Sequence, residues 1–244
     1  MSLPYRIHSI PVTESTNDDV KEAARSGEAE GFVVWAWEQK GGRGRQGRTW
    51  YSPPGNLYAS ILLRPPGEAR HAARYAFVAA LALHDLVKDY LPDAAITLKW
   101  PNDVLVFGKK ISGVLMESSL TPQSKLEWLV VGMGLNIEHH PQDTPYPATS
   151  LRHEGLSSYV DLQSTVQNLC AHFFRWKESL EIQGFPAVRA AWLNHAQLGA
   201  LTVHLPDGLI NGVFTGLNDD GGLVLQLADG TKQAISAGDV FFHT

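Results

Sequence analysis

Apolar residues gather in short runs along the N-terminal quarter of the chain, and polar residues separate these runs. Residues 7–12 form the first run, 32–37 are rich in aromatic and β-branched residues, and 57–63 form the third run. The second and third runs are typical of β-strands. Between the first two, the polar segment 15–19 offers several N-cap residues and early carboxylates. It predicts a helix that continues to about Ser26.

Helical spacing marks three longer segments. In residues 70–90 the apolar positions recur at intervals of three or four, as seen for Ala73, Phe77, Ala80, Leu81 and His84. Pro92 follows this segment, as is common just beyond a helix end. Residues 160–183 and 186–194 are predicted to be helices as well.

Three more strand-like runs lie in the middle of the chain, at residues 104–107, 111–117 and 128–135. Gly108-Lys109 separates the first two and predicts a tight hairpin turn, because glycine readily supplies a positive φ. Residues 138–150 are a proline-rich loop.

The pattern changes near His195. From Ala200 onward, short alternating runs are separated by turn residues at Pro206-Asp207-Gly208, 218–222 and 229–230. Four or five short strands with such turns predict a small β-barrel. The preceding part shows no β-α-β alternation, and its strands are close enough for hairpins. The sequence therefore predicts an α+β fold with a mixed or antiparallel sheet and packed helices, divided into domains at 1–195 and 196–244.

Composition excludes several classes of protein. Of 244 residues, 44% are hydrophobic, which is enough for a core, and 20 Lys and Arg against 25 Asp and Glu argue against general nucleic-acid binding. No segment has the features of a signal peptide or a membrane-spanning helix. Cys170 is the only cysteine, so an intrachain disulfide and a cysteine zinc site are excluded, as suits a cytoplasmic location. The ten histidines are scattered and show no metal-binding spacing.

One basic loop stands out in this acidic chain. The nine residues Lys40–Arg48 hold four of the 20 cations and four of the 22 glycines. The segment matches GxGxxG literally and is one residue from a P-loop, but both motifs require a following helix. Pro53-Pro54-Gly55 makes a long helix here untenable. Two readings remain: a solvated surface loop, or a loop that is mobile when empty and folds over an anionic ligand.

Two further clusters have the same chemical character. Lys99-Trp100-Pro101-Asn102-Asp103 joins a cation, an amide and a carboxylate at a proline turn, and could also be only a decorated turn. Lys110 enters a strand beside the small residues Ser112 and Gly113, although a lysine there can also protect an exposed strand edge. Residues 132–137 again combine glycines with an amide. Lysine, arginine, asparagine and backbone donors suit phosphoryl or nucleotidyl chemistry.

Together these segments resemble the biotin–protein ligases. The resemblance rests on five motifs in matching order and spacing: Ser15-Thr16-Asn17, Gly-Arg-Gly-Arg-x-Gly-Arg within 39–48, Lys99-Trp-Pro-Asn-Asp103, Lys110-x-x-Gly113 and Gly132-x-Gly-x-Asn136. It covers essentially the whole chain. It implies the fold of class II aminoacyl-tRNA synthetases and biotin synthetases, with an SH3-like C-terminal barrel.

The resemblance also implies an activity, that of a biotin–[acetyl-CoA-carboxylase] ligase. Biotin would react with magnesium-ATP to give biotinyl-5′-AMP, and the biotinyl group would pass to a lysine of a biotin carboxyl carrier domain. We expect a cytoplasmic enzyme with no membrane or nucleic-acid partner, and a homodimer is compatible with this family. There is no room before Ser15 for the DNA-binding domain that some members carry, so a monofunctional ligase is expected.

Site residues carry over from the family position by position. The expected biotin contacts are Ser15, Thr16, Asn17, Gln39, Arg43, Gly44, Arg45, Trp50, Lys110, Gly113, Leu115 and Gly132. The expected ATP and adenylate contacts are Arg43, Arg45, Arg48, Lys99, Asn102, Asp103, Lys110 and Asn136. Lys110 and Arg45 are the expected catalytic residues, and Lys110 would bridge the biotin carboxylate and the α-phosphate. Asp103 is the candidate magnesium contact.

One loop position departs from the family pattern. Gln46 stands where an arginine is frequent, but Arg43, Arg45 and Arg48 remain, so activity should be retained. Two alternatives stay open: a lipoate–protein ligase of related fold, and a non-catalytic biotin sensor or binding module.

Overall fold

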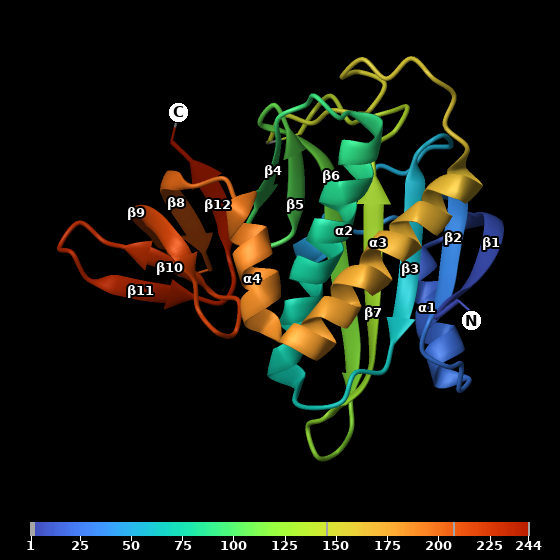
Figure 1. Ribbon diagram of the computed structural model, residues 1–244, viewed down its shortest axis with the longest axis horizontal. Helices are drawn as coiled ribbons and strands as arrows, with labels where there is room; N and C mark the ends of the chain where they lie inside the picture. Colours follow the sequence, from blue (N-terminus) through green and yellow to red (C-terminus); the bar gives the residue numbers. More distant parts are fainter. Residues whose placement is uncertain (1–2, 145, 207, 244) are drawn as a thin grey trace.

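A computed structural model describes residues 3–144, 146–206 and 208–243 of the chain, and its arrangement is shown in Figure 1. Asp207 of the predicted turn at 206–208 lies outside these ranges. The larger sheet has seven strands: β1 (Arg6–Thr13), β2 (Phe32–Gln39), β3 (Leu57–Leu63), β4 (Ile96–Lys99), β5 (Asp103–Val106), β6 (Lys109–Leu120) and β7 (Leu126–Leu135). Their order across the sheet is β1-β2-β3-β7-β6-β5-β4. The α+β fold with a mixed sheet is therefore confirmed.

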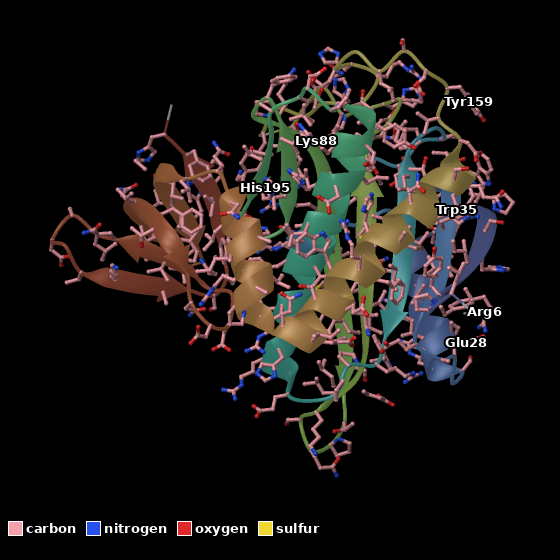
Figure 2. All side chains as sticks on the ribbon, in the orientation of Figure 1. Arg6, Glu28, Trp35, Lys88, Tyr159 and His195 are labelled. Atoms are coloured by element: carbon pink, nitrogen blue, oxygen red, sulfur yellow. The ribbon has the colours of Figure 1, made fainter. Side chains whose placement is uncertain are left out.

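The first two strands form a β-α-β unit, which the sequence analysis did not expect. β1 and β2 are parallel, and α1 (Thr16–Arg25) crosses between them. The other neighbouring pairs of this sheet are antiparallel. An ion pair of 2.5 Å between Arg6 and Glu28 joins the start of β1 to the segment after α1 (Figure 2). The prediction failed because a single short helix between two short runs shows no repeated alternation.

Successive side chains of each strand point to opposite faces of the sheet, and helices pack against both faces. Val33 and Trp35 of β2 pack into the core that contains α2 (Arg74–Tyr90), α3 (Leu162–Gln183) and α4 (Phe185–Asn194), the helices in front of the sheet in Figure 1. Val34 points the other way and packs with Val20 of α1. Residues 69–73 form a 3-10 turn, so the α-helix predicted from residue 70 begins at Arg74. No helix in the described part of the chain is long and apolar enough to cross a membrane.

The hairpin between β5 and β6 turns one residue earlier than predicted. Val106 pairs with Lys109, which leaves Phe107 and Gly108 as the two turn residues, with φ of 48° and 75°. A two-residue turn with positive φ at both positions has the twist that suits adjoining strands. Lys109 therefore begins β6. The four-residue strand β4 had not been identified from the sequence, because it is too short to show a pattern.

The C-terminal strands form a separate antiparallel sheet. They are β8 (Gly199–Leu205), β9 (Gly208–Leu217), β10 (Leu223–Gln226), β11 (Lys232–Ile235) and β12 (Asp239–Phe242), in the order β11-β10-β9-β8-β12. Within the described residues no pairing joins β11 to β12, so closure into an SH3-like barrel stays a prediction. The division into domains at residue 195 stays one too.

The two sheets are joined at the free edge of β4. The Leu98 N–H donates to the His195 carbonyl at 2.7 Å, and the Gln197 N–H donates to the Leu98 carbonyl at 2.8 Å. His195 lies at the end of α4 between the C-terminal sheet and the rest of the molecule (Figure 2). Residues 195–197 thus pair with β4 in parallel.

A turn of the C-terminal sheet enters the main core. The Trp100 indole N–H donates to the Gly221 carbonyl at 2.9 Å. At Gly221 a β-carbon would lie 2.6 Å from the Phe77 ring, so only glycine fits against it. One hydrophobic core runs through both parts, because Phe77 and Leu223 belong to the same cluster.

Candidate active site

A cavity of about 700 Å³ opens on the face of the large sheet that also carries α1. Its floor includes the strand residues Gly113, Gly132 and Gly134, which have no side chains to fill the space. All seventeen residues expected at the site line this one cavity: Ser15, Thr16, Asn17, Gln39, Arg43, Gly44, Arg45, Arg48, Trp50, Lys99, Asn102, Asp103, Lys110, Gly113, Leu115, Gly132 and Asn136. The structure brings them together, while their individual roles stay predictions.

The cavity extends along strand β6. Along this strand, Leu115 pairs with Gly132, Gly113 pairs with Gly134, and Lys110 lies three residues further on. At about 3.3 Å per residue, the distance from Leu115 to Lys110 is roughly 16 Å. The Leu115 end can therefore hold one group of a ligand while the Lys110 end holds another.

On its floor the Leu115 end, called the uncharged end below, is lined by neutral hydrogen-bonding groups. The Gln39 carbonyl oxygen Oε1 accepts from the Thr16 backbone N–H at 2.9 Å, and Gln39 Nε2 donates to Ser52 Oγ at 3.1 Å. Thr16 Oγ1 lies 2.7 Å from Ser60 Oγ, and Ser60 donates to Asn17 Oδ1 at 2.6 Å. Sequence reasoning missed Ser60, because a serine inside an apolar strand carries no motif.

Asn17 links this end to a charged cluster behind it. Its Nδ2 donates to Glu117 at 2.8 Å, and the Lys21 ammonium contacts the other oxygen of the same carboxylate at 2.6 Å. Gly132 is what makes room for Asn17, because a β-carbon there would lie 2.1 Å from Asn17 Oδ1. Gly132, an expected ligand contact, is thus required by a side chain of the site itself.

The basic loop leaves β2 and bends over this end of the cavity. Arg43 donates two hydrogen bonds to Asp18, at 2.6 and 2.8 Å, and they lower the pKa of Asp18 to about 2. Arg43 and Thr49 form an isolated antiparallel bridge that closes the loop. Residues 45–47 form a single 3-10 turn, so no α-helix opens here, in agreement with the exclusion of a P-loop and a dinucleotide motif. Ordering of this loop by an anion stays a prediction.

Trp50 ends the loop and lies flat against the floor. A β-carbon on Gly134 would come within 2.6 Å of its indole, and one on Gly113 within 3.3 Å. Its indole N–H is buried and has no hydrogen-bond partner among the described residues. Lys110 Nζ lies 5.6 Å from the centre of its ring.

Charges of both signs meet at the Lys110 end. Lys110 Nζ lies 2.5 Å from Asp103 Oδ1. Arg45 donates to Asn102 Oδ1 at 3.4 Å, and the amide of Asn102 donates in turn to the Val114 carbonyl. The loop, the β4–β5 turn and β6 each contribute to this cluster, so the three charged motifs of the sequence converge here.

Beyond this cluster the wall is aromatic. Lys99 Nζ lies 4.1 Å from the ring centre of Tyr146 and 5.8 Å from that of Phe241, and the two rings stack at 4.9 Å. Burial lowers the pKa of the Lys99 ammonium. Arg48 forms an ion pair with Asp239 of the C-terminal sheet, which also lines the cavity. Tyr146, Asp239 and Phe241 were missed, since nothing in their local sequence links them to the other motifs.

Asn136 holds the end of β7 rather than facing another charged group. Its side-chain amide donates to the Thr149 carbonyl at 2.9 Å, and its backbone N–H donates to the Ile111 carbonyl at 2.9 Å. It thereby fixes the loop that follows residue 146 against the start of β6.

The cavity therefore offers three environments in series: hydrogen-bonding groups without charge, a cationic centre with one carboxylate, and an aromatic wall with further cations. Such a site can bring two anions into contact, because cations reduce their repulsion. Within the described residues no group of three or more His, Cys, Asp or Glu side chains could hold a metal ion by itself.

Comparison with family models gives two matches. The model described as the biotin/lipoate A/B protein ligase family matches residues 9–136, and the biotin protein ligase C terminal domain matches residues 200–243. Together the matches cover the cavity motifs up to Asn136 and the C-terminal sheet.

Individual proteins are similar over nearly the whole chain. A biotin–[acetyl-CoA-carboxylase] ligase of Paracoccus denitrificans is 37% identical, over 94% of this chain and 98% of its own length. The bifunctional ligase/repressor BirA of Bacillus subtilis is 30% identical, over 93% of this chain and 71% of its own length. The solved biotin protein ligase of Aquifex aeolicus in complex with biotin and ATP superposes with a TM-score of 0.80 at 26% identity, with 97% of each chain covered.

Proposed function

This chain belongs to the biotin protein ligase family, and from that membership we propose that it activates biotin with ATP and transfers biotin to a protein lysine. The observation that carries the proposal is the convergence of Lys110, Arg45 and Asp103 in a cavity whose two ends differ in chemistry. The uncharged end suits the ureido ring of biotin. The cationic centre suits the meeting of a carboxylate and a phosphate.

In the first step an oxygen of the biotin carboxylate attacks the α-phosphorus of ATP. A carboxyl–phosphate bond forms, the bond to the leaving pyrophosphate breaks, and biotinyl-5′-AMP results. Lys110 would neutralise both reacting anions, and Arg45 would stabilise the charge that develops on the phosphate. Lys99 and Arg48 lie further along the cavity, where they can receive the departing pyrophosphate.

Magnesium fits the carboxylates at this end of the cavity. Asp103 and Asp239 both line it, beside Lys110 and Arg48 respectively. Mg²⁺ is usually held by one or two carboxylates together with phosphate and water oxygens, so a larger protein cluster is not required. When bound with ATP, the ion would neutralise phosphate charge, and Asp103 and Asp239 would be its protein contacts.

In the second step the ε-amine of an acceptor lysine attacks the carbonyl carbon of the mixed anhydride. An amide bond forms, AMP leaves with the electron pair of the broken bond, and the amine loses a proton. The anhydride must be protected from water in the meantime. The basic loop, with Trp50 at its end, provides that cover. A biotin carboxyl carrier domain is the proposed acceptor, and a second copy of the chain the proposed assembly partner.

Incubation with biotin, magnesium-ATP and an apo carrier domain tests this function. The mass of the carrier should rise by one biotinyl group, and replacement of biotin by lipoate should leave it unchanged. Carrier mass that stays the same with biotin, for a carrier that a known ligase biotinylates, would refute the proposal. A rise with lipoate alone would favour the related lipoate–protein ligases.

A matched pair of lysine variants locates the chemistry. Lys110→Ala should abolish the mass shift. Lys125→Ala changes an exposed lysine in the turn between β6 and β7, far along the strand from the cationic centre, and should leave the shift intact.

A further inference from the structure

Behind the uncharged end of the cavity, four side chains form one continuous chain of hydrogen bonds. It runs from Glu117 through Asn17 and Ser60 to Thr16, and only Asn17 and Thr16 line the cavity. Ser60 is fully buried and Glu117 lies on the outer half of β6. Each link is short, at 2.8, 2.6 and 2.7 Å, so each must contain a proton.

The carboxylate fixes the direction of the chain. A carboxylate only accepts hydrogen bonds, so the amide nitrogen of Asn17 must face Glu117. The amide oxygen then faces Ser60, and because that oxygen also only accepts, the Ser60 hydroxyl must donate to it. The 2.7 Å contact between Ser60 and Thr16 still needs a proton, and only the Thr16 hydroxyl can supply it. Thr16 is left with an oxygen lone pair.

A second chain of hydrogen bonds reaches Thr16 from the side of Gln39. It too leaves an oxygen acceptor beside the cavity. The Ser52 hydroxyl donates to the Trp50 carbonyl at 2.8 Å, so Ser52 must accept from the amide nitrogen of Gln39. This turns Gln39 Oε1 toward Thr16, whose backbone N–H it accepts. Gln39 and Thr16 both line the cavity, and Thr16 Oγ1 lies 3.2 Å from Gln39 Oε1, within reach of a hydrogen bond from the Thr16 hydroxyl. The same Thr16 proton is needed by the 2.7 Å contact with Ser60, and because that contact is much shorter, the proton goes there and both Gln39 Oε1 and Thr16 Oγ1 remain acceptors.

From this we propose that Glu117 and Ser60 are positioning residues that hold Thr16 as a hydrogen-bond acceptor, so that the cavity selects a ligand group bearing N–H donors. Within the function proposed above, on which this inference rests, that group is the cyclic urea of biotin. Neither residue touches the ligand. They act by setting the direction of the protons in the side chains that do.

The inference predicts a specificity that shape alone does not give. A cyclic carbamate, in which one ring N–H of the urea is replaced by oxygen, has nearly the same shape but lacks one donor. An oxygen opposite the Thr16 lone pair would leave both groups unpaired, and sites built to bind a donor reject such analogues strongly. The wild-type protein should bind biotin at least about tenfold more tightly than the carbamate whose missing N–H faces Thr16.

Two variants break the chain at different links. Glu117→Gln offers Asn17 a donor as well as an acceptor. Only the long 3.5 Å contact from Asn17 Nδ2 to the Leu115 carbonyl then opposes a flip, so the Asn17 amide can turn over and the direction is lost. Ser60→Ala removes the link itself and frees the Thr16 proton to point at Gln39. In both variants the preference for biotin over that carbamate should fall to about threefold or less. Lys21→Met removes the cation beside Glu117 but keeps the carboxylate, and its preference should match the wild type.

The measurement is titration calorimetry with biotin and with the two cyclic carbamates, on the full chain without ATP. Thermal melting establishes that each variant is folded, and Ser60→Ala keeps the test available if Glu117→Gln does not fold. A wild-type preference retained in both folded variants, or no preference in the wild type, would overturn the inference. A wild-type protein that binds no biotin would instead refute the proposed function.

Discussion

Substitution of Gly132 by alanine tests the packing of the uncharged end directly. The backbone of Gly132 does not have a positive φ, so alanine fits the strand itself. Its β-carbon, however, would lie 2.1 Å from Oδ1 and 2.9 Å from Cγ of Asn17. Asn17 is buried and its amide is held on both sides, so it cannot move without breaking these contacts.

The expected cost follows from the contacts that must break. The hydrogen bond from Ser60 to Asn17 joins neutral groups and is worth about 1 kcal/mol. The hydrogen bond from Asn17 to Glu117 involves a charge and is worth about 1.5 kcal/mol or more. The Glu117 side chain remains 29% exposed, so water compensates for part of the lost hydrogen bond from Asn17. Gly132→Ala should therefore lower the free energy of unfolding by about 2–3 kcal/mol.

Urea denaturation of four proteins isolates the cause: wild type, Gly132→Ala, Asn17→Ala and the double variant. Asn17→Ala removes the amide that the new β-carbon would strike. Gly132→Ala should then cost less than about 0.5 kcal/mol in that background, which gives a coupling free energy near 2 kcal/mol. Equal costs in the two backgrounds would show that Gly132 is required for another reason, and the reasoning would be refuted.

Four other outcomes are expected. Lys110→Ala should slow biotin-dependent exchange between ATP and pyrophosphate by about 100-fold or more. The half-buried ion pair between Lys110 and Asp103 contributes little to stability, so the melting temperature should shift only slightly. Loss of the exchange activity together with a large drop in melting temperature would show that the residue is structural. Cleavage by trypsin within residues 41–52 should slow when biotin or the adenylate is bound, and equal rates would contradict ordering by an anion. The hydrogen bonds from Arg43 hold the pKa of Asp18 at about 2, below its unfolded value of 3.8, so their stabilisation is present above about pH 4 and is lost as the pH falls toward 2. Urea denaturation should thus show a shallower loss between pH 4 and 2 for Asp18→Asn, by less than about 1 kcal/mol because the group is partly exposed. Burial raises the pKa of the Cys170 thiol to about 12, so a thiol reagent at pH 8 should label it only in denaturant, and labelling of the folded protein would disprove that burial.

The site could be located from the sequence because its motifs are local. Residues 15–17, 99–103 and 132–136 each fall at the end of a strand or the start of a helix, where short segments carry a recognisable pattern. Their convergence on one cavity is a property of the fold, and the resemblance to a family supplied it.

What the sequence did not reveal depends on contacts between distant segments. Ser60 is a single polar residue in an apolar strand, and Glu117 begins a short polar run in β6 that carries no motif. Only the register of β3, β7 and β6 brings them behind Asn17. Asp239 and Phe241 reach the cavity from the C-terminal sheet, about 140 residues beyond the cluster at 99–103. The β-α-β unit and the short strand β4 escaped detection for the same reason, since pairing partners rather than local pattern define them.

The parallel pairing of residues 195–197 with Leu98 covers the edge of β4 with the segment that leads into the C-terminal sheet. A chain that ends before His195 would leave β4 with an uncovered edge, which is a template for association with other copies. It would also expose the Trp100 and Phe77 surface against which the turn at Gly221 packs. Such a fragment is expected to precipitate. Residues 195–244 added as a separate peptide should cover both exposed surfaces, and should restore solubility together with the Asp239 side of the cavity.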